Sequence, residues 1–158
     1  MTRDQLLDRI ELGWSAFQSS YAGLPEERLL QPGVAGDWSV KDTIAHVSWW
    51  EDESLTHLPH ILAGGRPPRY SVTYGGIDGF NALMTERKRE LSLAEALAYA
   101  EETHERLLAF LHTVPDDQIA TETRFRRRLR LDTYGHYPIH TEMIRRWRDE
   151  SSHARDGC

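Results

Sequence analysis

The sequence of residues 38–47 is Trp38-Ser39-Val40-Lys41-Asp42-Thr43-Ile44-Ala45-His46-Val47. Its apolar side chains recur every three or four residues, which is the spacing of one face of an α-helix. Ser39 suits the N-cap position, and the carboxylate of Asp42 lies in the first turn, where the helix dipole favours it. We therefore expect a helix that starts at residues 38–42 and ends near Gly64 and Gly65, before Pro67 and Pro68.

Similar apolar stripes predict further helices on both sides of this one. They run from about 4 to about 22, from 77 to about 88, from the Ser92–Glu95 capping-box pattern to just before Pro115, and from around 133 to 150. Residues 65–76 are rich in proline and glycine and predict an irregular crossover. The expected fold is all-α: a four-helix bundle with a long crossover and an extra short helix between the second and third main helices.

The composition narrows the class of protein. A chain of 158 residues fits one domain spanning residues 1–158. Its 19 Lys and Arg against 25 Asp and Glu argue against a nucleic-acid partner, because surfaces that bind phosphates carry a basic excess. Cys158 is the only cysteine, which excludes an intrachain disulfide and a cysteine-rich metal site. No apolar run is long enough for a membrane span or a signal peptide, so we expect a cytoplasmic protein without a membrane partner.

The strongest chemical pattern is His136-Tyr137-Pro138-Ile139-His140. Histidines four apart on a helix lie about one turn apart on the same side, so both imidazoles can reach one metal ion at ~2.0–2.1 Å. Their stripe continues through Met143, Ile144 and Trp147, which predicts that the pair faces the bundle interior. The alternative is two core histidines that donate to buried carbonyls. Pro138 predicts either a kink between the two histidines or a helix that begins there.

Two further histidines deserve separate interpretations. His46 lies at the edge of the apolar stripe of its helix, where a side chain can line a crevice between helices; the alternative is a boundary histidine bonded to solvent. His104 falls on the apolar stripe of the third main helix and is interpreted as a satisfied core histidine that could line the site. The others are expected outside the site: His57 and His60 near a helix end, and His112 and His153 on the surface.

A basic segment runs from Arg124 to Arg130 with the sequence Arg124-Phe125-Arg126-Arg127-Arg128-Leu129-Arg130. We interpret it as a solvated loop that offsets acidic neighbours. The alternative is an anion clamp for a carboxylate or phosphate at the mouth of the bundle, because arginine makes bidentate contacts to such groups.

Two of these stretches together resemble a known family. Residues 36–47 resemble the second-helix signature of DinB/YfiT-like four-helix bundles, in which W-[ST]-V-K-D opens the helix and the histidine is a metal ligand. Residues 132–140 are similar to the T-Y-x-H-Y-x-x-H segment that opens the fourth helix, in particular in the branch of the ClbS/DfsB small-molecule resistance proteins. The resemblance implies that His46, His136 and His140 hold a divalent metal, nickel or zinc first and iron or manganese otherwise. It also implies a homodimer.

Three functions follow as hypotheses. The first is a metal-dependent enzyme that acts on a small-molecule substrate by hydrolysis or thiol-dependent transfer, with metal-bound water as the nucleophile and Trp50, His104 and Tyr137 as pocket residues. The second is a metal-free protein of the ClbS/DfsB type that binds a reactive small molecule for self-protection. The third is a dimerising bundle with no small-molecule role. The sequence identifies no general base.

Overall fold

Four long helices form the body of the molecule: α1 (Arg3–Tyr21), α3 (Val40–Leu62), α6 (Leu93–Leu111) and α9 (Tyr137–Asp156). The computed structural model describes the backbone of residues 1–156 and the side chains of residues 1–152. Cys158 and the side chain of His153 lie outside this part. Since no strand occurs among the described residues, the prediction of an all-α bundle is confirmed.

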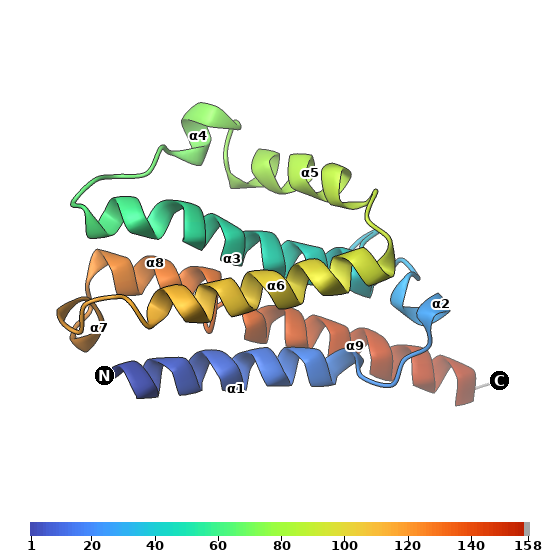
Figure 1. Cartoon of the computed structure of the whole chain (residues 1–158). Coiled ribbons are helices and arrows are strands. Elements are labelled where there is room, and N and C mark those ends of the chain that lie inside the picture. Colours follow the sequence, from blue (N-terminus) through green and yellow to red (C-terminus); the bar gives the residue numbers. More distant parts are fainter. Residues whose placement is uncertain (157–158) are drawn as a thin grey trace.

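The long helices pair side by side (Figure 1). Helix α3 packs along α6, and α1 packs along α9, while α3 also contacts α9. Each long helix contributes fully buried apolar side chains to one core, including Ile10 and Phe17 of α1, Ile44 of α3, Leu107 of α6 and Ile144 of α9. No helix in the described part of the chain is both long and apolar enough to cross a membrane.

Capping boxes set the starts of two long helices where the sequence predicts them. The backbone N–H of Asp42 donates to Ser39 Oγ at 3.1 Å, and the Asp42 carboxylate accepts from the backbone N–H of Ser39 at 3.0 Å. Ser92 and Glu95 make the same reciprocal pair at the start of α6. Both pairs satisfy backbone donors that have no partner inside the helix.

The crossover between α3 and α6 lies over the outer side of α3 (Figure 1). It contains α5 (Ile77–Lys88), the expected extra helix, and α4 (Tyr70–Thr73), which the sequence analysis did not predict. Helix α5 packs on α3 through a second apolar cluster, which contains Phe80, Trp49 and Trp50 and in which the Phe80 ring contacts that of Trp50. The crossover therefore adds a layer to one side of the bundle.

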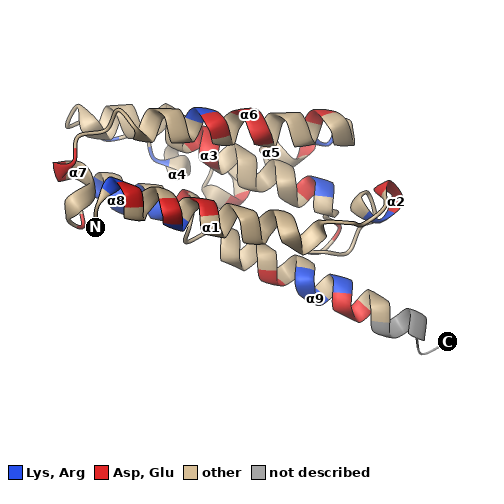
Figure 2. Ribbon diagram, turned by 60° about the horizontal axis from the view of Figure 1, so that its bottom comes forward, with Lys and Arg blue, Asp and Glu red and all other residues tan. Residues whose placement is uncertain are grey.

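The arginine-rich segment is not a loop. It forms α8 (Arg124–Asp132), capped by Thr123, whose hydroxyl accepts from the backbone N–H of Arg126. Phe125 and Leu129, four residues apart, are fully buried against the core. The arginines lie between these positions on the other sides of the helix. In the view of Figure 2, α8 and α1 overlap, and basic and acidic residues are mixed in that region. Two further short helices, α2 (Glu26–Leu29) and α7 (Asp117–Ala120), were also not predicted.

Helix α9 begins at Tyr137 rather than near Thr133, so Pro138 lies in its first turn. A proline is tolerated there because the first backbone N–H groups of a helix have no helical partner, and no kink is needed. A tight turn precedes the helix: the N–H of Gly135 donates to the carbonyl of Arg130. A Cβ at Gly135 would lie 2.8 Å from that carbonyl oxygen, so the turn requires glycine.

Candidate metal and ligand site

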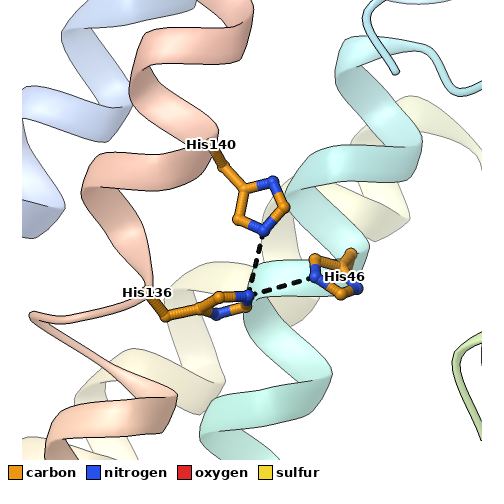
Figure 3. A group of neighbouring side chains, drawn as sticks. All are labelled: His46, His136 and His140. Atoms are coloured by element: carbon orange, nitrogen blue, oxygen red, sulfur yellow. Dashed lines mark hydrogen bonds between the residues drawn. The ribbon is translucent and has the colours of Figure 1, made fainter. Parts of the chain in front are cut away.

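Three histidine side chains from two parts of the chain converge at the centre of the bundle (Figure 3). His46 comes from α3, His136 directly precedes α9, and His140 lies on α9. The Nε2 atom of His136 lies 3.1 Å from Nε2 of His46 and 2.9 Å from Nε2 of His140. One ligating atom from each residue lies within 4.8 Å of the others.

Different local structures direct the three imidazoles. His46 is buried on α3, where its ring packs against Trp38 and Trp49 at centroid distances of 4.8 and 4.9 Å. His140 is buried and is the fourth residue of α9. His136 is held by the turn before α9, so the sequence argument that both histidines share one helical face is wrong for His136. The turn nevertheless brings its imidazole to the same point.

The three imidazoles are neutral near pH 7. Burial lowers the pKa of His46 to about 2, with the charges that His140 and His136 would carry as further causes. Burial and the neighbouring His140 lower the pKa of His136 to about 3, and burial lowers the pKa of His140 to about 4. A neutral imidazole has a free lone pair, which is the state that binds a metal ion.

The residues fit a divalent ion in donor type and spacing. Imidazole nitrogen suits zinc, nickel and iron. Two nitrogens bound to one ion at ~2.0–2.1 Å lie about 2.9–3.4 Å from each other, depending on the angle at the metal, and the two Nε2 separations fall in that range. The second ring nitrogen of each histidine differs from that of a typical metal-binding histidine: each Nδ1 is buried without a hydrogen-bond partner among the described residues. A metal-binding histidine usually donates that N–H to an acceptor.

A cavity of about 450 Å³ adjoins the cluster. His46 and His136 form one part of its wall, Trp50 of α3 and Tyr70 of α4 form another, and Arg128 and Asp132 of α8 form a third. Ile77 and Leu131 also line it and are 56% and 67% exposed, which places apolar side chains at its opening. This size and this mixture of apolar, aromatic and few polar groups are typical of small-molecule sites.

The α8 wall carries a partly buried ion pair that the sequence analysis missed. Arg128 Nε donates to Asp132 Oδ2 at 2.6 Å, and Arg128 Nη2 donates to the hydroxyl of Tyr70 at 2.8 Å. Ser54 Oγ donates to the same Asp132 oxygen at 2.6 Å. Burial raises the pKa of Asp132, while Arg128 and Ser54 partly oppose that shift. A signal was available, because Asp132 continues the stripe of Phe125 and Leu129 at helical spacing.

Of the three residues expected in the pocket, one lines the cavity and two lie elsewhere. Trp50 lines the cavity and donates from Nε1 to Asn81 Oδ1 at 3.1 Å. His104 and Tyr137 are not among the residues that line it. They meet instead at the carboxylate of Glu51: His104 Nδ1 lies 2.9 Å from Glu51 Oε1, and the Tyr137 hydroxyl donates to the same oxygen.

Glu51 was also missed, although it occupies a core position on α3, four residues after Val47. It is fully buried. Burial raises its pKa, and the contacts with His104 and Tyr137 partly oppose that rise. His104 Nε2 also lies 2.7 Å from Glu11 Oε1, and the His104 ring stacks on Trp14. His104 is therefore a buried histidine with a hydrogen-bonding partner at each ring nitrogen, as the sequence analysis predicted.

Solved structures share this fold. DfsB, described as a sibling lethal factor precursor, superposes with a TM-score of 0.79 at 14% identity, covering 96% of this chain and 97% of that chain. The colibactin self-resistance protein ClbS, in complex with a dsDNA, gives a TM-score of 0.77 at 14% identity, covering 92% and 94%. An uncharacterised protein from Escherichia coli UTI89 gives 0.78 at 18% identity, covering 96% and 95%. No curated protein matches the sequence.

The family can be assigned from the sequence as well. The model of the DinB superfamily matches residues 9–143, which include all three converging histidines. Both the sequence match and the all-helical fold shared with DfsB and ClbS agree with the resemblance seen in the two motifs. This chain belongs to the DinB superfamily.

Proposed function

We propose that the protein binds a reactive small molecule in the cavity beside the histidine cluster and thereby protects the cell from it. The observation that carries this proposal is the cavity itself, which combines aromatic walls with a few convergent polar groups. Further support comes from the shared fold with ClbS, whose description is a self-resistance protein. The cavity has hydrogen-bonding groups of its own, so binding in it does not depend on a metal ion.

A neutral fluorescent aromatic probe, N-phenyl-1-naphthylamine, tests the proposal because its emission rises in apolar surroundings. Protein stripped of metal with EDTA is titrated with the probe, and the titration is repeated with nickel or zinc present. We expect saturable one-site binding with the same Kd, within about twofold, in both conditions. Binding only in the presence of the metal would contradict metal-independent binding and favour the second candidate.

The second candidate is a metal-dependent enzyme that acts on a small molecule by hydrolysis or thiol-dependent transfer. The observation that favours it is the convergence of three neutral imidazoles with Nε2 separations of 2.9 and 3.1 Å. His46, His136 and His140 would hold the ion, which would supply Lewis acidity and lower the pKa of a water. The test is metal analysis of protein purified without a metal-affinity tag, where stoichiometric nickel, zinc, iron or manganese is expected.

We further propose that the partner is a small molecule rather than a nucleic acid, and that the protein is a homodimer in the cytoplasm. The formal net charge of −6 supports the first statement. Three of the five arginines of α8 support it too, because Arg126 and Arg130 pair with Glu122, and Arg128 pairs with Asp132. Slower migration of duplex DNA with the protein in a mobility-shift assay at physiological salt would contradict the absence of a nucleic-acid partner. Sedimentation equilibrium tests the dimer.

A further inference from the structure

The end of α8 offers the cavity two hydrogen-bonding groups that the protein itself leaves unused. Asp132 is 4% exposed and lines the cavity; its Oδ2 accepts from Ser54 and Arg128, whereas its Oδ1 has no partner among the described residues. Arg128 uses Nε for Asp132 and Nη2 for Tyr70, and its Nη1 has no partner in the described part of the chain. One acceptor and one donor therefore lie together in the same wall.

The charge of this wall is balanced. The positive charge of Arg128 is offset by the Asp132 carboxylate, whose Oδ2 lies 2.6 Å from Arg128 Nε. An anionic ligand would be attracted to Arg128 but repelled by Asp132, and a cationic ligand would meet the reverse. The cavity thus disfavours charged ligands, which argues against the anion clamp that the sequence analysis considered for residues 124–130.

Building on the proposed function, we propose that Arg128 and Asp132 bind an uncharged amide or lactam group carried on an aromatic body. An amide carries a carbonyl acceptor and an N–H donor side by side, which matches an arginine N–H and a carboxylate oxygen. Charge-assisted hydrogen bonds of this kind are shorter and stronger than neutral ones. Trp50 and Tyr70, with ring centroids 5.4 Å apart, line the same cavity and can pack against the aromatic body.

The decisive experiment compares four naphthalene probes with the wild-type protein, each by competition with N-phenyl-1-naphthylamine. They are 2-naphthamide, N,N-dimethyl-2-naphthamide, 2-naphthoate and 2-naphthylmethylammonium. We expect 2-naphthamide to bind about tenfold more tightly than each of the other three, because only it offers both hydrogen bonds without a charge. Binding of the dimethyl amide or of the naphthoate as tight as that of 2-naphthamide would overturn the inference.

Variants then assign the preference to residues. Asp132→Asn should weaken 2-naphthamide binding about tenfold and leave the dimethyl amide unchanged, since that compound has no N–H for Oδ1. Glu122→Gln is the matched control. The Glu122 carboxylate pairs with Arg126 and Arg130 of α8, as Asp132 pairs with Arg128, but Glu122 does not line the cavity. An equal effect of Asp132→Asn on both amides would contradict the assignment. Should Asp132→Asn fail to fold, the wild-type probe series decides.

The outcomes separate this inference from the proposed function. If N-phenyl-1-naphthylamine binds the cavity but the four naphthalene probes compete equally well, the amide inference is wrong and the proposed function stands. If neither N-phenyl-1-naphthylamine nor any of the four probes binds, both are contradicted.

Discussion

The Nε2 atoms of His46 and His136 lie 3.1 Å apart, although 90 positions separate the two residues in the chain. Helix α3 carries one of them and the turn before α9 holds the other. The two residues belong to the two sequence motifs that resemble the DinB family signature, so this contact brings the two motifs together in the fold. It also forms part of the wall of the cavity on which the proposed function rests.

The second candidate predicts that His46→Ala weakens binding of Ni²⁺ or Zn²⁺ by at least about 100-fold. This loss of affinity is larger than the loss expected when only a hydrogen bond that orients a metal-binding side chain is removed. At a free metal concentration about 100 times Kd, metal binding raises the free energy of unfolding of the wild-type protein by about 2.7 kcal/mol, which raises Tm by roughly 5–10 °C. Thermal melts with and without the metal measure both effects. His57→Ala is the control, since His57 lies on the same helix but bonds Glu53. A wild-type Tm that does not respond to either metal would rule this candidate out.

Gly13→Ala should destabilise the protein, although alanine is the better helix former by about 1 kcal/mol. A Cβ at Gly13 would lie 2.8 Å from Cδ2 of Tyr137, a ring that is fully buried and bonded to Glu51. We expect a net loss of about 1–3 kcal/mol in the free energy of unfolding, measured in urea. Ser15→Ala, at an exposed position of the same helix, should cost far less. Equal stability of Gly13→Ala and wild type would show that Tyr137 is not fixed.

The charge of His104 should give stability a pH dependence. Burial opposes its protonation, but the hydrogen bonds and charges of Glu51 and Glu11 outweigh burial and raise its pKa. A raised pKa means that the folded state binds a proton that the unfolded state has released. This contribution to stability is complete below about pH 6.5 and is lost as the pH rises through the folded pKa.

Urea denaturation of wild type and His104→Phe from pH 6 to 9 measures this effect. The free energy of unfolding of the wild type should fall more steeply over that range than that of His104→Phe. His112→Ala should follow the wild type, because His112 is exposed at the end of α6. Parallel curves for wild type and His104→Phe would mean that His104 is not charged between its two carboxylates.

Local signals predicted most of the bundle because they act within a few residues. The reciprocal bonds of Ser39 with Asp42 and of Ser92 with Glu95 set helix starts that can be seen in the sequence. Helix α8 was missed because its apolar stripe has only Phe125 and Leu129, and the third buried position is Asp132. A stripe completed by a carboxylate gives too weak a periodic pattern to indicate a helix.

The sequence analysis identified the three histidines and Trp50, but it missed the buried carboxylates of Glu51 and Asp132. His136 and His140 stood out because they occupy positions on an apolar stripe, and the same reasoning applied to carboxylates would have identified Glu51 and Asp132. What the sequence could not supply is pairing across the chain. The partners of these carboxylates include Tyr137, 86 residues after Glu51, and Ser54, 78 residues before Asp132. Such distant contacts are decided by packing of the whole bundle.

Titration of metal-stripped protein with N-phenyl-1-naphthylamine, applied to wild type, Trp50→Ala and Leu97→Ala, tests the central claim most directly. Trp50 forms a wall of the cavity, while Leu97 is an exposed residue of α6 outside it, so its variant controls for adhesion to surface apolar groups. Circular dichroism first establishes that each variant is folded. We predict saturable one-site binding to wild type and Leu97→Ala, and binding at least about tenfold weaker to Trp50→Ala. No saturable binding to the wild type, or equal binding to all three proteins, would contradict a small-molecule site beside the histidine cluster.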